Sequence, residues 1–553
     1  MDPLPSGRIG DVHVGEVDGI RTVWAEAPGE FSGGIVVRVG HVDETLPSRG
    51  LTHMLEHLAL FGLDRPGEHS NGHVDATTLT LHSSGTPEDV AQFLNRAARQ
   101  LVDPPVARLA DEKGVLRAEA AGRSQHPLNE ITAWRWGAQT YGLEVTNELG
   151  VRAMTAEAVR EWAATRIGRR NAVLWFTGPP PAGLDLALPE GEERPAPDPY
   201  RSPLPSFPAY LVSQAPGVIV HGLVRRSPAA VTAASVLRSR LLDDLRTSRA
   251  ASYSPEVGYR PLTGGAAAVV AFADVVEGRE DVVAERVPAA LAEIIADGPT
   301  EQELSARRAE VRRGPEMPGF AGARVTSVAW DVLHGGRVQT MEEILADADQ
   351  VTADQVATAA GDVRRDALLQ IPVGVQLPPF PWVKAPDSLS PPVEPGRSFR
   401  FLGGDVRLVV APEGVTVTGR ELVLTVRREN IAALGRWEDG GRLLIGTDGI
   451  HLTVEPTIWR AGRKAVEIID ATVPDEVTVD LGTRPDESVP RISWGRRLRR
   501  LAGPGLEVLA VSLPAVGMVL VAVVGREDLV PVSIAVTMVA ATAILVRRKR
   551  SQP

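Results

Sequence analysis

Two histidines and a glutamate stand close together in the stretch RGLTHMLEHLALFG, residues 49 to 62. The apolar residues around them predict a helix, and positions i and i+4 of a helix share a face. His53 and His57 can therefore direct two imidazoles at one metal ion. Glu56 lies on the same face, where it is placed to take a proton from metal-bound water, whose pKa zinc lowers to about 7. The spacing H-x-x-E-H thus favours zinc-dependent peptide hydrolysis over its alternative, a solvated polar helix face.

A catalytic zinc site needs a third protein ligand, commonly a carboxylate. The predicted helix DEKGVLRAEAAG carries Glu112 and Glu119 two turns apart on one face. Either could reach the metal if this helix packs on the first one, and spacing does not choose between them. His69, His73 and His82 cluster nearby in the sequence and are interpreted as strand and loop residues, with a second metal site as the alternative.

Composition narrows the class of protein. A net charge of −11 argues against nucleic-acid binding, which normally needs a basic face. The absence of cysteine excludes disulfides, thiolate zinc sites and cysteine nucleophiles, so a metal site must use His, Asp or Glu. The N-terminus lacks the basic and apolar regions of a secretory signal.

Two proline-rich stretches divide a chain that, at 553 residues, is too long for one core. Before and between them, strands and amphipathic helices follow in a similar order, which suggests a duplicated α+β unit. After them, short strands joined by Gly and Asp turns, ending with KAVEIIDATVP, predict a small all-β module. The predicted divisions are a metal-binding domain 1–187, a linker 188–208, a second domain 209–375, a linker 376–396, the all-β module 397–485, a basic segment 486–505, an apolar segment 506–546 and a basic tail 547–553.

The apolar segment contains two uncharged stretches, 508 to 525 and 529 to 546, separated by Arg-Glu-Asp. Each is long enough as a helix to approach the roughly 30 Å hydrocarbon core of a bilayer. Arginine clusters flank the pair on both outer sides, so the positive-inside rule places both ends in the cytoplasm. We expect a transmembrane helical hairpin in the cell membrane with the other domains on the cytoplasmic side. A buried hairpin of a soluble core is the alternative.

The sequence resembles the family of zinc peptidases that includes pitrilysin, insulin-degrading enzyme and mitochondrial processing peptidase. GHVDETLPSRGLTHMLEHLALFG is similar to the family's G…E…G…HxxEHxxFxG block, and SNGHVDATTLTL is similar to its Asn-Gly/Ala…Thr…Thr strand. MTAEAVREWAATRIGRRNAVLWFTG resembles the family's domain ending. The likeness covers about residues 10 to 375 and implies two tandem peptidase-type α+β domains.

The resemblance also implies roles for single residues. EKGVLRAE looks like the family's downstream helix, which makes Glu119 the third zinc ligand and Glu112 a supporting residue that orients a ligating histidine. SRLLDDLRTSRAASYS resembles the block whose arginine and tyrosine hold the substrate carbonyl and help to stabilise the oxyanion. These map to Arg246 and Tyr253. The segment 397–485 resembles bacterial pleckstrin-homology-like modules.

These observations predict a membrane-anchored zinc endopeptidase, with one zinc per chain, that cleaves short or unfolded peptides. Relatives enclose the substrate between four domains, and this chain supplies two. It therefore resembles the half-length members that pair, as a homodimer or with a related chain. Arg246 and Tyr253 would then act on the zinc site of the same or of the other copy. A non-catalytic scaffold on the same fold is the rival hypothesis.

Overall fold

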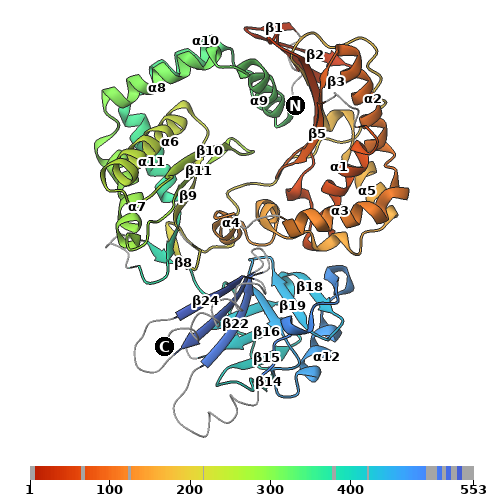
Figure 1. Ribbon diagram of the computed structural model, residues 1–553, viewed down its shortest axis with the longest axis vertical. Helices are drawn as coiled ribbons and strands as arrows, with labels where there is room; N and C mark the ends of the chain where they lie inside the picture. Colours follow the sequence, from red (N-terminus) through yellow and green to blue (C-terminus); the bar gives the residue numbers. More distant parts are fainter. Residues whose placement is uncertain are drawn as a thin grey trace, which may run out of the picture.

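The computed structural model describes residues 7–63, 69–122, 126–215, 217–375, 382–419, 422–492, 507–513, 518–524 and 532–537. Figure 1 shows two units of helices and sheet that face each other, with a third, strand-rich module beneath them. The predicted mixture of helix and sheet is confirmed.

The first unit is built on a mixed sheet with the strand order β1-β2-β3-β7-β4-β6-β5. Its strands are β1 (Gly7–Ile9), β2 (Val12–Val17), β3 (Ile20–Trp24), β4 (Phe31–Val37), β5 (His69–Val74), β6 (Leu79–Gly85) and β7 (Ala172–Phe176). One face packs on helices α1 (Leu51–Leu60), α2 (Pro87–Val102) and α5 (Ala156–Arg166), and α3 (Leu109–Gly122) packs on α1. Strand β5 lies at the edge of the sheet and pairs with β6.

The second unit repeats this plan with the order β10-β11-β9-β12-β8-β13. Its strands are β8 (Ala209–Ser213), β9 (Val218–Arg225), β10 (Glu256–Pro261), β11 (Ala266–Ala273), β12 (Leu368–Pro372) and β13 (Val383–Lys384). Its helices are α6 (Pro228–Leu241), α7 (Glu280–Asp297), α8 (Glu301–Arg313), α10 (Met341–Gln350) and α11 (Ala353–Arg365). A core rich in alanine and valine joins α6, α7 and α11 to the sheet.

The two units exchange a helix. Helix α9 (Phe320–Leu333) comes from the second half of the chain but packs on the inner face of the first sheet, where its valines meet those of β2, β3 and β7. Helix α4 (Asn129–Trp136) comes from the first half and packs on the second sheet. The α4 residue Arg135, which is 1% exposed, pairs with Asp366 at 3.1 Å. Each sheet is therefore completed by a helix from the other half (Figure 1).

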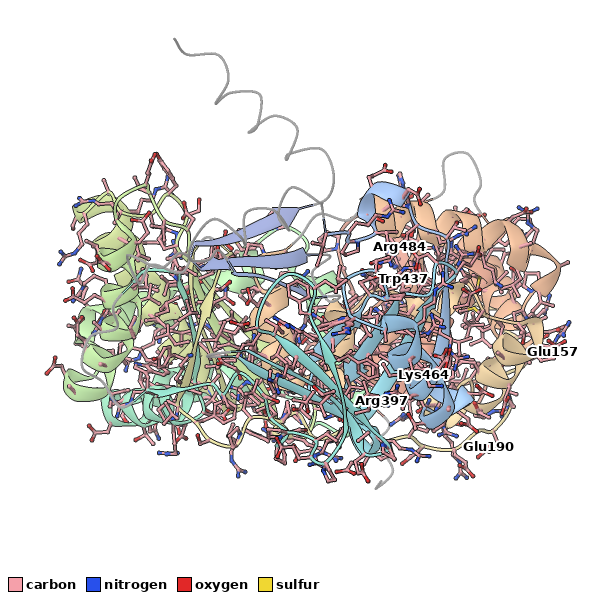
Figure 2. All side chains as sticks on the ribbon, turned by 90° about the horizontal axis from the view of Figure 1, so that it is seen from below. Glu157, Glu190, Arg397, Trp437, Lys464 and Arg484 are labelled. Carbon is pink, nitrogen blue, oxygen red and sulfur yellow. The ribbon has the colours of Figure 1, made fainter. Side chains whose placement is uncertain are left out.

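The third module contains two further sheets. Their strands are β14 (Arg397–Arg400), β15 (Arg407–Ala411), β16 (Gly414–Thr418) and β17 (Val423–Arg427), and then β18 (Ile431–Trp437), β19 (Arg442–Gly446), β20 (His451–Val454) and β21 (Thr478–Gly482). Trp437 and Arg484 lie together on this module, with the guanidinium 4.1 Å from the ring centroid (Figure 2).

The prediction that this module is all-β is wrong at KAVEIIDATVP. All but the last two of these residues belong to helix α12 (Gly462–Thr472), because Ala465, Val466 and Ile469 form one buried helical face. The β-branched residues suggested a strand, although their spacing fits the helical period.

In the residues that the structure describes, the C-terminal apolar segment also differs from the prediction. Strands β22 (Glu507–Leu513), β23 (Met518–Val524) and β24 (Val532–Thr537) form an antiparallel sheet where the sequence predicted two helices. A continuous apolar run does not distinguish a strand from a helix, and valine favours the strand. Among the residues that the structure describes, no helix is long and apolar enough to cross a membrane. The rest of 506–546, together with 493–505 and 547–553, lies outside the described residues.

Candidate metal centre

Helix α1 presents the histidines because its other face is buried. Met54, Leu55 and Leu58 are fully buried against the first unit. Gly50 precedes the helix with φ of 105°, a left-handed conformation that glycine adopts without strain. The helix is therefore fixed in rotation, and His53 and His57 lie side by side with ring centroids 4.8 Å apart.

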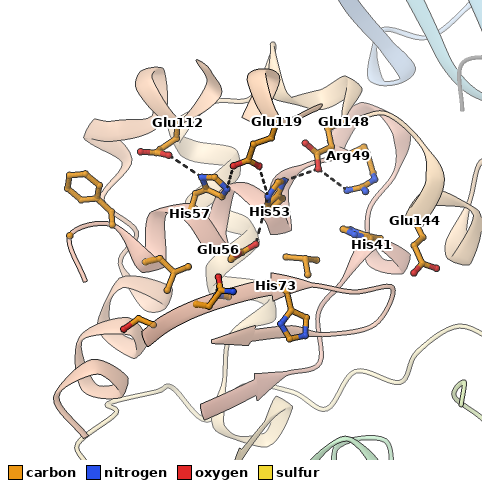
Figure 3. Close-up of a pocket in the computed structure, with 17 residues that line it drawn as sticks. His41, Arg49, His53, Glu56, His57, His73, Glu112, Glu119, Glu144 and Glu148 are labelled. Atoms are coloured by element: carbon orange, nitrogen blue, oxygen red, sulfur yellow. Dashed lines mark hydrogen bonds and ion pairs between the residues drawn. The ribbon is translucent and has the colours of Figure 1, made fainter. Parts of the chain in front are cut away.

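Helix α3 packs against α1 and brings Glu119 to both histidines (Figure 3). The Nε2 atoms of His53 and His57 lie 3.5 and 3.7 Å from the Glu119 carboxylate oxygens. One ligand atom from each of the three residues lies within 4.8 Å of the others. Two imidazoles and a carboxylate that converge in this way form a donor set that suits zinc.

Each histidine has a carboxylate on its other ring nitrogen. Glu112 lies 3.2 Å from Nδ1 of His57, and Glu148 lies 2.9 Å from Nδ1 of His53. A carboxylate on Nδ1 holds the proton there and leaves Nε2 free to donate its lone pair. The observed orientation of both rings therefore fits a metal bound through Nε2.

Glu56 lies below the histidines and points into the same space (Figure 3). Its carboxylate is 3.9 Å from Nε2 of His53, and the residue is 7% exposed. Burial raises the pKa of this carboxyl above its ordinary value, and the two histidines offset part of that rise. Gly72 of β5 makes room for the group, because a Cβ there would lie 2.9 Å from Oε1 of Glu56.

These groups open into a cavity of about 770 Å³. Strand β5 forms one wall, with Ser70, Gly72 and Val74 among the lining residues. Leu60 and Phe61 make an apolar end, and the Arg108 guanidinium lies 4.7 Å from the Phe61 ring centroid. The cavity thus combines the polar cluster with a sheet edge and an apolar end.

The other histidines near the site do not form a second cluster of this kind. His73 and His82 lie on neighbouring strands with ring centroids 6.4 Å apart. A hydrogen bond with Asp75 raises the pKa of His73, whereas burial lowers the pKa of His82. Within the described part of the chain, the group of His53, His57 and Glu119 is the one metal-ligating cluster of three residues.

Arg246 and Tyr253 lie away from the cavity of their own chain. Arg246 is on the π-helical turn Leu242–Ser248 that follows α6. Tyr253 is 70% exposed, and its backbone N–H donates to Asp274 at 3.1 Å. Neither residue is among those that line the cavity.

Sequence reasoning missed Glu148 and the residues that support it. Glu148 is 95 residues from His53, so no local spacing connects them. Glu44 is the glutamate that precedes the histidines in the family-like block, but the sequence did not predict a role for it. In the structure it accepts hydrogen bonds from the backbone N–H of Thr52 at 2.7 Å and from Arg49 at 2.9 Å. Glu44 therefore caps the start of α1.

No protein-family model matches this chain, and no curated protein matches its sequence. Solved structures do match its fold. A protease from Helicobacter pylori has a TM-score of 0.51 at 12% identity and covers 66% of this chain and 100% of its own. An inactive domain of peptidase M16 from Pseudomonas fluorescens has a TM-score of 0.52 at 15% identity, over 66% of this chain and 100% of its own.

Pitrilysin matches with a TM-score of 0.52 at 14% identity, over 67% of this chain and 46% of its own. The chain has the fold of the M16 peptidases. The predicted resemblance to pitrilysin-type peptidases is thus confirmed at the level of the fold. One of the matched structures is of a domain described as inactive, so the fold by itself does not decide between an enzyme and a scaffold.

Proposed function

We propose that this chain is a zinc-dependent endopeptidase. The observation that carries the proposal is the convergence of His53, His57 and Glu119 on one point, with Glu56 beside it. Zinc bound there would polarise the substrate carbonyl and lower the pKa of a bound water. Glu56 accepts the proton of the attacking water and returns it to the leaving amine. Glu112 holds the His57 ring through Nδ1.

The substrate that fits best is an extended peptide. Strand β5 is at the sheet edge and pairs with β6 on its other side. An edge strand offers backbone N–H and C=O groups to a peptide, which can add to the sheet as a further strand. Such a peptide would pass along the wall beside Glu56. A folded protein would have to expose an unstructured segment first.

Arg246 and Tyr253 are proposed to complete the site of a second copy, because they lie outside the cavity of their own chain. The match covers 46% of pitrilysin, so this chain corresponds in extent to about half of that enzyme. Two copies, or this chain and a related one, would supply the missing half. The arginine and tyrosine would then bind the substrate carbonyl and the oxyanion.

Attachment to the cell membrane through 506–546 is a further part of the proposal and rests on the sequence alone, because the described parts of this segment are strands. It rests on the two uncharged stretches and the arginine clusters that flank them. Reporter domains fused before residue 1 and after residue 553 should both report the cytoplasm. A reporter that is found on the opposite side of the membrane would contradict this topology.

The rival function is a non-catalytic scaffold, which the inactive M16 domain among the structural matches keeps open. The two functions differ in what Glu56→Gln does. In an enzyme, this substitution should leave zinc binding intact and lower peptide hydrolysis by about 10² to 10⁴. Glu157→Gln, on the exposed surface of α5, is the matched control and should change neither (Figure 2).

The measurements are zinc content and cleavage of unfolded peptides by the full chain. A wild-type protein that binds zinc but cleaves no peptide, either alone or with a related chain, would support the scaffold instead. A wild-type protein that binds no zinc would contradict both the enzyme and the assigned ligands.

A further inference from the structure

The third module packs directly on the segment that carries Glu148. This segment, residues 137–152, links α4 to the end of the first unit and contains the short 3-10 turns Thr140–Val145 and Leu149–Val151. The hydrogen bonds of such turns have poorer geometry than those of an α-helix, so the position of the turns depends more on what packs against them. Strand β21 of the third module contacts the turn Leu149–Val151, and β18 contacts the turn Leu46–Ser48 of the first unit.

The contact is an apolar cluster with members on both sides. Leu46, Ala138 and Leu143 of the first unit pack with residues of β18, β19 and β21. The module residues in this cluster are Ala433, Leu443, Ile445 and Val479. All of these are less than 10% exposed. The interface is therefore a continuous piece of core.

Two backbone features fix the register of this interface. The N–H of Ala138 donates to the carbonyl of Thr447 at 3.0 Å. Gly137 has φ of 73°, and a Cβ there would lie 2.2 Å from the same carbonyl. A side chain at this position would thus separate the module from α4, which shows how closely the two backbones approach.

The same cluster reaches the neighbour of Glu148. Leu149 packs against it from the turn that begins immediately after Glu148. On the far side of this turn, Arg152 lies over Gly482 of β21, where a Cβ would be 2.5 Å from the guanidinium carbon. The module therefore holds the chain on both sides of Glu148.

On the inner side, Glu148 is part of a buried polar chain (Figure 3). The Glu148 side chain is 3% exposed, and its Oε1 is hydrogen-bonded to Nδ1 of His53 at 2.9 Å. Arg49, which is 1% exposed, lies 3.9 Å from the same carboxylate and donates to the carbonyl of Leu143 at 2.9 Å. Arg49 thus connects the turn Thr140–Val145 and Glu148 to the start of α1.

We propose that Glu148 is a positioning residue for His53 and that the third module holds Glu148 in place. The inference rests on the proposed zinc site. Glu148 fixes the proton on Nδ1 of His53 and aims Nε2 at the position between His57 and Glu119. Because a ligand must be held to within about 0.5 Å to bind well, movement of the turn weakens metal binding. The module is then a structural part of the metal centre, although it contributes no ligand.

The local part of the proposal is tested with Glu148→Ala and Glu148→Gln in the full chain. Glu148→Ala removes the partner of Nδ1, so zinc affinity, measured by competition with a chelator, should fall by about 10- to 100-fold. Glu148→Gln keeps an oxygen acceptor and should stay within a few-fold of wild type. In ¹⁵N-histidine spectra of the metal-free protein, the tautomer of His53 should change with Ala and persist with Gln.

The module's part is tested with a matched pair of leucines. Leu443→Ala removes apolar atoms from the cluster that contacts the active-site segment. Leu424→Ala removes the same atoms from the other core of the module. The two residues are similarly buried, 5% and 7% exposed. Leu443→Ala should lower zinc affinity and broaden the His53 signals, whereas Leu424→Ala should lower only the thermal stability of the module.

Equal zinc affinity in wild type and Glu148→Ala would overturn the role of Glu148. Equal loss of affinity in Leu443→Ala and Leu424→Ala would overturn the specific link to the module. If the wild type binds no zinc, the proposed function fails, yet the His53 tautomer in the metal-free variants still reports whether Glu148 positions the ring.

Discussion

Four carboxylates surround the two histidines, and each lies in a different place. Glu112 and Glu148 contact the Nδ1 atoms, Glu119 faces the Nε2 atoms, and Glu56 is buried beneath the histidines. In the proposed zinc site, Glu112 and Glu148 would orient the rings, Glu119 would complete the ligand set, and Glu56 would act as the base. Burial raises the pKa of the Glu56 carboxyl. Residue type alone does not separate these roles, since all four are glutamates.

The difference between Glu119 and Glu112 can be measured directly. Glu119→Gln should lose most of its zinc, because a neutral amide is a poor ligand where a carboxylate faced both Nε2 atoms. Glu112→Gln should retain zinc with an affinity lowered by about 10-fold, since it only loosens the His57 ring. Metal analysis after dialysis provides the comparison, and full zinc content in both variants would contradict the ligand assignment.

Substitution of Gly72 tests whether Glu56 needs the space that this glycine leaves beside its carboxylate. In Gly72→Ala the new methyl would lie 2.9 Å from the Glu56 carboxylate and 2.8 Å from Leu81, so the carboxylate must move. We expect zinc content to persist while kcat/KM falls by up to about 10²-fold, the effect of a misplaced catalytic group. Gly114→Ala on α3, where nothing lies within 4 Å, is the control and should keep full activity. A fully active Gly72→Ala would show that the position of Glu56 tolerates the shift.

The sequence predicted the residues of α1 and α3 because a helix converts local spacing into a shared face. His53, Glu56 and His57 needed only the helical period. Glu112 and Glu119 remained alternatives on spacing and were assigned by the family resemblance. Glu148 could not be found in this way, because it reaches His53 through the packing of a turn and not through a repeat.

At the scale of elements, two of the helices that were not predicted cross between the halves of the chain. No helix was predicted at α4 or at α9, which pack on the opposite unit. Their apolar residues match a surface that is distant in sequence, so the local pattern does not indicate a partner. The differences at α12 and at β22–β24 have another cause. A short run of β-branched and other apolar residues fits both a helix and a strand, and only the packing decides between them.

The contact between the third module and α4 contains a titratable group. Burial raises the pKa of Asp448 from 3.8 to about 6, and its side chain accepts a hydrogen bond from the Ile450 N–H at 3.0 Å. The folded state therefore binds more protons than the unfolded state between these values. Stability falls as pH rises from about 4 to about 6 and stays lower above that range.

Asp448→Asn removes this penalty and keeps an oxygen acceptor for Ile450. At pH 7 the variant should be more stable than wild type by about 1 to 3 kcal/mol, and the gain should vanish near pH 4. Thermal unfolding of both proteins at the two pH values measures the difference. A gain that is the same at both pH values would attribute the effect to something other than the charge.

At the scale of the molecule, the two units are held in a fixed relation. Arg260 of β10 forms an ion pair with Glu144 at 2.7 Å. The hydroxyl groups of Tyr141 and Thr263 are hydrogen-bonded to each other at 2.5 Å. Glu144 also lines the cavity, so the second unit reaches its rim. The units share a plan, yet within the described residues the metal-ligating cluster belongs to the first. The proposed function therefore takes Arg246 and Tyr253 from a second copy or a related chain.

Complementation tests this shared pocket. Glu56→Gln and Arg246→Ala should each be nearly inactive, but a mixed dimer has one site with an intact Glu56 and the partner's intact Arg246. After subunit exchange, the mixture should recover about a quarter of wild-type activity, because half of the dimers are mixed and each has one working site. An inactive mixture with proven exchange would place the catalytic arginine elsewhere.

The exchange of α4 and α9 has a consequence for biosynthesis. When a ribosome has translated residue 187, every described strand of the first sheet exists, but its inner valine-rich face still lacks the cover that α9 supplies. That cover is translated more than a hundred residues later, at about 5 to 20 residues per second. The nascent first half therefore spends several seconds with a bare apolar surface, which makes it a client for a ribosome-associated chaperone. A chain that stalls before residue 320 should remain bound to one.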